Sequence, residues 1–404
     1  MNALIPGIQK RQLPGSQKGV ALLVAMMALL AGSALFLVNG HKSDLRSDQL
    51  ESLLSAKQAL MAYAVNYADN YGHNTRGGTG RLPCPSLIPH GTPARSCGPG
   101  AIGYLPSVWM RDGRLMEIDY LERFLDQNIW YAVSADHRYN PSFNTLNSYR
   151  GDNLLAVDSD HDIVAVLIAP GPALGNQNRN SAAGPSAVSV VAEYLEGENA
   201  DSDNEYTVSG TNDLLVAIRR SELLPLMERR VLGHLKEWLS EYKAINGFYP
   251  FASIPGADGL CVQGLTRGML ASERGTCTAV AFSDVTYTGL PQGRALRQTW
   301  FYRYNLPALI YYIVDETCIE GRAATDCDGI DDPERTLTVN GNPVEVVLIS
   351  VGPPIETAPL ADLQVHCTAE IINYLDTEAT MTDGMEFRTP FLSAVSNDQL
   401  VFIN

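Results

Sequence analysis

The sequence predicts an α+β protein in which a transmembrane helix continues into a helix packed on an antiparallel sheet, followed by a second helix-plus-sheet unit. Three observations predict it: an uncharged apolar run over residues 20–38, an amphipathic helical pattern directly after it, and motifs that recur in the same order. Helices that precede runs of strands are typical of α+β folds. The expected segments are a leader at 1–19, a transmembrane helix at 20–39, and repeats at 40–219 and 220–404.

The apolar run contains a single polar side chain, that of Ser33. At 1.5 Å per residue, a helix of this length nearly spans the hydrocarbon layer of a bilayer. The leader before it carries Lys10, Arg11 and Lys18 and no acidic residue. This charge asymmetry predicts a cytoplasmic leader, with the rest of the chain exported.

A basic segment, then Gly19, then an apolar helix beginning at Val20 resembles the leader of the type IV pilin and pseudopilin superfamily. The resemblance implies that a prepilin peptidase cuts between Gly19 and Val20 and methylates the new N-terminus. Most members begin the mature chain with Phe and have Glu at its fifth position, where this chain has Val20 and Val24. Some minor pilins and the largest minor pseudopilin of type II secretion systems also lack that Glu, so the departure implies a minor subunit.

The function implied by this resemblance is that of a non-enzymatic subunit of a type IV pilus or type II secretion-type filament, acting in assembly, in initiation or at the tip. Its partners would be other pilin or pseudopilin subunits, the prepilin peptidase and the inner membrane. The chain would cross that membrane once, with a cytoplasmic N-terminus and its bulk in the periplasm or in an extracellular filament.

Two other interpretations of the leader remain open. The first is a secretory signal peptide cut after Gly32-Ser33-Ala34, and the second is an uncut single-pass anchor. Under either, the chain would be a membrane-anchored or secreted binding or adhesion protein with two repeats and no role in a filament.

An internal duplication follows from motifs that recur at a nearly constant offset. The matched segments are YADNYG and YKAING (67–72, 242–247), NIWYAVSAD and ALIYYIVDE (128–136, 308–316), VAVLIAPGP and VVLISVGPP (164–172, 346–354), and NDLLVAI and NDQLVFI (212–218, 397–403). Apolar spacing predicts helices over 44–71 and from Ser221 to about Gly247. β-Branched and aromatic runs predict strands at 128–134, 163–169 and 213–218.

Seven cysteines without CxxC spacing favour disulfides over zinc in an exported chain. Neighbouring positions indicate the pairs Cys84–Cys97, Cys261–Cys277 and Cys318–Cys327, with Cys367 left over. The formal net charge of −16 argues against nucleic-acid binding, because no basic stripe is present to neutralise phosphates.

Clusters of acidic residues are candidate calcium sites, because Ca²⁺ takes oxygen ligands from closely spaced carboxylates. They are Asp158, Asp160 and Asp162; Glu198, Asp201, Asp203 and Glu205; and Asp326, Asp328, Asp331 and Asp332. The alternative for each is a solvated acidic turn. The sequence shows no nucleophile or metalloprotease motif, and a GxGxxG match at Gly98, Gly100 and Gly103 lacks the strand and helix of a dinucleotide site. We therefore expect no enzymatic activity.

Overall fold

The structure is a computed structural model, and it describes residues 46–68, 79–138, 153–352, 386–387 and 398–404. Within these ranges it leaves out residues 90, 99, 112–113, 118–127, 180–186, 202, 255–258, 291–292, 304–305 and 323–335. By its internal packing the chain divides into residues 1–52 and residues 53–404. Both sheets described below belong to the second unit.

The first sheet has the strand order β1-β4-β6-β5-β7, and β8 also pairs with β6. Its strands are β1 (Ile102–Tyr104), β4 (Trp130–Val133), β5 (Leu155–Val157), β6 (Asp160–Ala169), β7 (Glu205–Tyr206) and β8 (Leu214–Arg219). The path β1-β4-β6-β8 is antiparallel throughout. The β-branched and aromatic runs that predicted strands at 128–134, 163–169 and 213–218 form β4, β6 and β8.

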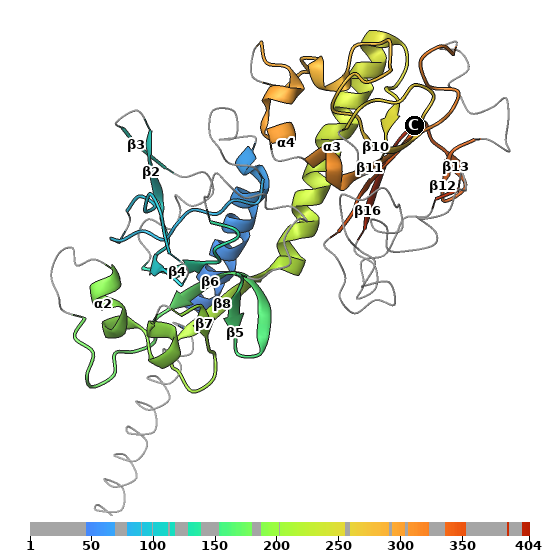
Figure 1. Cartoon of the computed structure of the whole chain (residues 1–404). Coiled ribbons are helices and arrows are strands. Elements are labelled where there is room, and N and C mark those ends of the chain that lie inside the picture. Colours follow the sequence, from blue (N-terminus) through green and yellow to red (C-terminus); the bar gives the residue numbers. More distant parts are fainter. Residues whose placement is uncertain are drawn as a thin grey trace, which may run out of the picture. The chain divides into compact units, whose positions relative to one another are not determined.

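Helical layers cover both faces of this sheet, because alternate residues of a strand point to opposite faces. Tyr131 and Leu167 belong to the main core with Leu60 and Tyr63 of the helix over residues 46–68. On the other face, Trp130 packs with Val190 of α2 (Ala187–Tyr194). Figure 1 shows the blue N-terminal helix behind β4 and β6.

Helix α3 (Arg220–Asn246) begins directly after β8 and opens the second half of the chain. It ends at Gly247, whose φ of 84° is the left-handed conformation that glycine adopts at low cost after a helix. Its buried side chains follow helical spacing, as expected from the sequence: Leu223, Leu224, Met227, Glu228, Val231, Leu232, Leu235, Trp238, Leu239 and Tyr242. This stripe packs on the second sheet.

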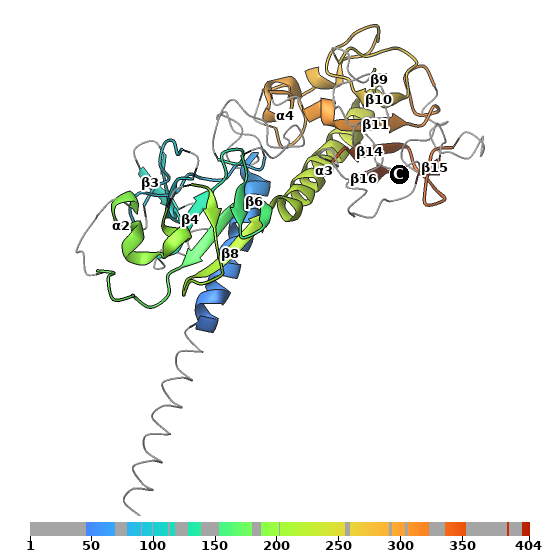
Figure 2. The same ribbon diagram turned by 60° about the horizontal axis from the view of Figure 1, so that its bottom comes forward.

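The second sheet has the order β16-β14-β11-β10-β9 and is antiparallel throughout. Its strands are β9 (Ala252–Ser253), β10 (Arg267–Leu270), β11 (Ile310–Val314), β14 (Val346–Ser350) and β16 (Gln399–Ile403). Helix α3 packs on β14 and β16 and lies along this sheet in Figures 1 and 2. The order β1-β4-β6-β8 therefore has a counterpart in β10-β11-β14-β16.

The remaining elements are short. They are the hairpin β2 (Val108–Arg111) and β3 (Arg114–Glu117), the small sheet of β12 (Thr338–Val339), β13 (Asn342–Pro343) and β15 (Glu386–Phe387), helix α4 (Trp300–Arg303), and the 3-10 helices η2 (Gly197–Ala200), η3 (Phe282–Asp284), η4 (Leu296–Gln298) and η5 (Leu306–Leu309). In the parallel pairs β5·β7 and β12·β15, the buried rings of Tyr206 and Phe387 hold matching places.

The two halves repeat individual contacts as well as topology. The Tyr131 hydroxyl donates to the Pro83 carbonyl at 3.0 Å, and the Tyr312 hydroxyl donates to the Pro250 carbonyl at 2.7 Å. Opposite these tyrosines in the neighbouring strands lie Gly103 and Gly268. A Cβ at Gly103 would lie 2.5 Å from the Ser86 carbonyl oxygen, and one at Gly268 would lie 2.0 Å from that of Ser253. Each glycine therefore lets the edge segment approach its sheet.

These contacts shift the sequence alignment of the two halves by one residue where β4 is matched with β11 and where β6 is matched with β14. The sequence match paired Tyr131 with Tyr311, but the shared hydrogen bond and register pair it with Tyr312. Sequence similarity alone could not choose between them, because two tyrosines are adjacent in β11. The boundaries at 40–219 and 220–404 remain a prediction.

The fold class expected from the sequence is wrong in its transmembrane helix. In the part of the chain that the structure describes, no helix is long and apolar enough to cross a membrane. Helix α3 has 27 residues, but charged residues such as Arg229 and Lys236 keep its sequence from being continuously apolar. The expected span at residues 20–39 lies outside the described residues. The described elements are those of a mixed α/β fold, and they do not support a single-pass location in the inner membrane.

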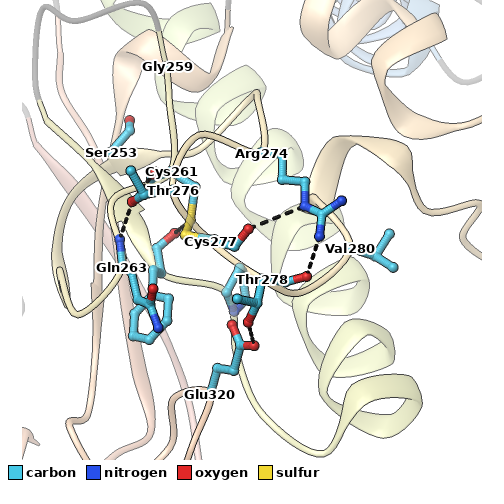
Figure 3. Close-up of a disulfide and its surroundings, with 12 residues drawn as sticks. Ser253, Gly259, Cys261, Gln263, Arg274, Thr276, Cys277, Thr278, Val280 and Glu320 are labelled. Atoms are coloured by element: carbon cyan, nitrogen blue, oxygen red, sulfur yellow. Dashed lines mark hydrogen bonds between the residues drawn. A yellow bond between two sulfur atoms is a disulfide. The ribbon is translucent and has the colours of Figure 1, made fainter.

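Disulfides tie down one loop in each half. Cys84 is bonded to Cys97 and Cys261 to Cys277, which are two of the expected pairs. Figure 3 shows the second bond with Arg274, which donates to the carbonyls of Cys277 and Thr278. Cys318 is also disulfide-bonded, to a partner outside the described residues. Cys327, the partner expected for Cys318, and Cys367 both lie outside the described residues, so the third pair stays a prediction.

Candidate functional site

Asp160 and Asp162 lie at the start of α3, where they bind protein groups. Asp160 accepts a hydrogen bond from the Arg219 guanidinium at 2.6 Å. Asp162 accepts one from Arg220 at 2.9 Å and one from the Ser221 backbone amide at 3.0 Å. Carboxylates are favourable at a helix N-terminus because unsatisfied amides and the helix dipole make it positive. These contacts give the two acids structural roles, and calcium binding by them stays a prediction.

Asp158 is a turn residue. Its φ is 52°, in the left-handed region, and its carboxylate accepts a hydrogen bond from the Thr207 hydroxyl at 2.6 Å. In the second half Asn340, with φ 51°, holds the matching place, because its amide donates to Phe387 as that of Asp158 donates to Tyr206. Asp and Asn are the non-glycine residues that best tolerate this conformation. The shared feature of the two turns is thus backbone shape.

Glu222 connects the start of α3 to the N-terminal helix. It accepts hydrogen bonds from Lys57 at 2.7 Å and from the Arg219 backbone amide at 2.9 Å. Burial alone would raise the pKa of Glu222, but these hydrogen bonds hold that pKa below its ordinary value. The hydrogen bond from Arg219 likewise lowers the pKa of Asp160. The start of α3 is therefore a junction of ion pairs between the first sheet and the second half.

The other acidic candidates have different outcomes. Asp326, Asp328, Asp331 and Asp332 lie outside the described residues, as do Gly19 and Val20 of the expected processing site. Oxygens of Glu198, Asp203 and Glu205 lie within 4.8 Å of one another at an exposed surface. Burial and the neighbouring Asp203 raise the pKa of Asp201. Calcium binding by either cluster stays a prediction.

Ser134 and His137 form a buried pair that the sequence analysis missed. The Ser134 hydroxyl oxygen lies 3.0 Å from Nδ1 of the His137 imidazole, and both residues are buried. Burial, with Arg81 and Arg220 nearby, lowers the pKa of His137 to about 3. A general base works best with a pKa near the working pH and must reach its substrate. This pair fits a packing role, and in the second half Asp315 and Cys318 stand in the matching places.

The aromatic side chains of Trp300, Phe301 and Tyr302 pack in or against the main core. Trp300 and Phe301 are buried. The Phe301 ring meets that of Trp238 on α3 edge to face, with centroids 5.7 Å apart. The His234 ring stacks on that of Trp238 with centroids 5.4 Å apart, and it meets the Trp300 ring edge to face at 6.3 Å. These aromatic contacts therefore attach α4 to α3.

An open groove lies between one face of the N-terminal helix and one face of α3. It has a volume of about 520 Å³ and is lined by Gln58, Met61, Ala62, Val65, Asn66, Leu226, Arg229, Arg230, Gly233, His234 and Glu237. Both sets of residues recur at intervals of three and four, so each is a single helix face. Binding sites are commonly concave and apolar with a few polar groups. Among the described residues, this groove is the best candidate for a binding site.

Gly233 shapes the groove. Apart from the neighbouring backbone of α3 itself, a Cβ built at this position would meet no atom within 4 Å, so glycine here relieves no close contact with another element. Glycine inside a helix costs about 1 kcal/mol relative to alanine. A glycine inside a predicted helix can be seen in the sequence, but the groove cannot, because the facing helix lies about 170 positions earlier in the chain. The ion pair from Lys57 to Glu222, which are 165 positions apart, joins the same two helices.

No family model, curated protein or solved structure matches the chain. The pilin-related expectations, including the expected transmembrane helix, thus have no support from known proteins, and the geometry above carries the functional argument.

Proposed function

We propose that the chain is a non-catalytic subunit of an exported assembly of the pilin filament type, built from two modules in series. The observation that carries the proposal is that one helix-on-sheet frame occurs twice, with matching registers, tyrosine hydrogen bonds and close glycines. A repeated frame suits a structural subunit, because the features that the two halves share are packing contacts. The filament type rests on the leader residues around Gly19 and Val20.

The charged clusters also support this proposal. Asp160, Asp162 and Glu222 fix the start of α3, and Asp158 shapes a turn. The buried His137 packs beside Ser134. These polar groups have structural roles that need no substrate, which is consistent with a protein that acts by assembly.

The test is the state of the chain in the cells that produce it. Antibodies against the second half should find the chain in the filament fraction. Its intact mass should be that of a chain that begins at Val20. Gly19→Leu should abolish that mass, whereas Gly15→Leu, in the same leader, should leave it unchanged. A chain that begins at Met1 or near Leu35, and that is absent from filaments, would contradict the proposal.

A second candidate is an exported binding protein without a filament role, and the groove favours it. Its volume of about 520 Å³ lies within the range typical of ligand sites, about 300 to 1,000 Å³. The same mass measurement separates the candidates, because this one predicts a different start of the mature chain.

A further inference from the structure

We propose that the groove is a docking site for a second copy of this chain, and that the occupant is the exposed face at the start of the helix over residues 46–68. The proposal gives the assembly role a specific contact, and it rests on that role only in requiring that copies meet. Two exposed surfaces of one copy would then cover each other between copies.

The first feature is the groove surface, which combines apolar side chains with positive charge. Met61, Val65 and Leu226 supply the apolar part, and Leu226 is 39% exposed. Arg229 and Arg230 are exposed along the α3 side, with His234 and Glu237 further along the helix. In a chain with a net charge of −16, adjacent arginines beside apolar residues make this surface unusual.

The second feature is an apolar and acidic face near the start of the N-terminal helix. Leu50 is 41% exposed and Leu54 is 46% exposed, and they lie one turn apart. Asp48 and Glu51 are exposed beside them, with Arg46 one turn before. Exposed leucines at helical spacing with flanking acids are the complement of an apolar groove with flanking arginines.

The dimensions of the two surfaces agree. The α3 side of the groove runs from Leu226 to Glu237, which is about 16 Å at 1.5 Å per residue. Two turns of a docking helix need about 11 Å. Helices bind in such grooves through residues at intervals of three and four, with side chains inserted between the groove walls.

Gly233 provides the space for such a side chain. Its missing Cβ leaves open space in the groove, and no close contact inside this copy requires glycine there. A leucine from the second copy would fill that space and bury apolar surface on both partners. Retaining a residue that weakens the helix is expected where binding needs the room.

The test is sedimentation velocity of the full chain and of charge-reversal variants. The wild type should associate as its concentration rises from about 1 to 100 µM, where contacts of modest area become populated. Arg229→Glu should weaken association at least tenfold, and so should the double variant Asp48→Lys/Glu51→Lys. An equal mixture of these two variants should form a one-to-one pair, because each still carries one intact partner surface.

Two further variants separate docking from folding. Gly233→Leu should fill the groove and abolish association while the circular dichroism spectrum stays that of the wild type. Arg322→Glu makes the same charge change at an exposed position outside the groove and should leave association unchanged.

The proposal is overturned if the wild type stays monomeric, if Gly233→Leu or Arg229→Glu associates as the wild type does, or if the mixed variants stay separate. A monomeric chain that nevertheless begins at Val20 and is found in filaments would reject this contact and keep the proposed function.

Discussion

The two halves of the chain share one arrangement of a helix on a sheet but differ in the polar side chains packed within it. Tyr131 and Tyr312 make the same buried hydrogen bond, yet the buried Ser134–His137 pair of the first half is replaced by Asp315 and Cys318 in the second. Asp315 accepts hydrogen bonds from the Thr317 hydroxyl and the Leu337 amide, so it is satisfied differently. The two halves thus share the strand register and the close approach of an edge segment to its sheet, whereas the polar groups at the strand ends differ.

The helices differ in the same way. Lys57 of the N-terminal helix reaches across to Glu222, and Met61 and Val65 face the open groove. In α3, Glu228 is buried and accepts a hydrogen bond from Gln399 at 2.6 Å, so this helix is tied to its own sheet. Both helices therefore present one face to the groove, and they differ in that Glu228 also ties α3 to its own sheet.

The largest expected effect comes from the two close glycines. Gly268→Ala should lower the free energy of unfolding by about 4 kcal/mol, because its φ of 149° and the Ser253 carbonyl both oppose a Cβ. Gly103→Ala should cost about 2 kcal/mol, since only the close contact applies. Urea unfolding measures both, with Gly233→Ala as the control that should stabilise by up to about 1 kcal/mol. If Gly268→Ala and Gly103→Ala both leave the free energy of unfolding nearly unchanged, the two glycines are not needed for the close approach of the edge segments.

Acid should weaken the first half more than the second. The pKa of His137 is lowered from 6.5 to about 3 in the folded chain, so the unfolded chain binds the extra proton between these values. Stability should therefore fall as the pH falls through that window, by at most about 1.4 kcal/mol per pH unit. Below about pH 4, the lowered pKa values of Asp160 and Glu222 act in the same direction.

Hydrogen exchange of β4 and β11, measured between pH 4 and 7, separates the two halves. Protection in β4 should fall first, and His137→Asn should remove most of the difference. If β4 and β11 lose protection together in the wild type, the two halves do not differ in this respect.

The shared tyrosines should give matched, moderate effects. Tyr131→Phe and Tyr312→Phe each remove a buried hydrogen bond to a proline carbonyl and should each cost about 1 to 2 kcal/mol. Thermal unfolding measures both. A cost at only one position would show that the tyrosines are not equivalent.

The smallest effect is expected at the junction. Lys57→Met should lower the free energy of unfolding by less than about 1 kcal/mol, because Glu222 is 37% exposed and solvent screens the ion pair. High salt should reduce the effect further. A loss that persists in 1 M salt would mean that packing, and not charge, joins the helices.

Several helices and strands were predictable from local patterns, although the expected fold class was wrong in its transmembrane helix. Helical spacing located the helix that ends at Gly247, and β-branched runs located β4, β6 and β8. Register was not predictable to the residue, because Tyr311 and Tyr312 are adjacent and only the hydrogen bond to Pro250 distinguishes them. The small parallel pairs were missed since two residues carry too little periodicity.

The sites were less predictable because they depend on contacts between distant residues. Nothing near Asp160 in the sequence indicates Arg219, which is 59 positions away. From the sequence alone the acids are therefore candidate cation ligands, and calcium binding there stays a prediction. The groove depends on two helix faces that only the fold brings together, and the expectation of a transmembrane helix finds no counterpart in the described residues.

The second half should be a complete module of the same kind as the first. The most direct test is to produce residues 220–404 alone and measure unfolding by circular dichroism and near-ultraviolet signals. We expect one cooperative transition, with Cys261 bonded to Cys277 and slow amide exchange at Tyr312. A chain that stays unfolded, or that folds only when residues 40–219 are added, would contradict it.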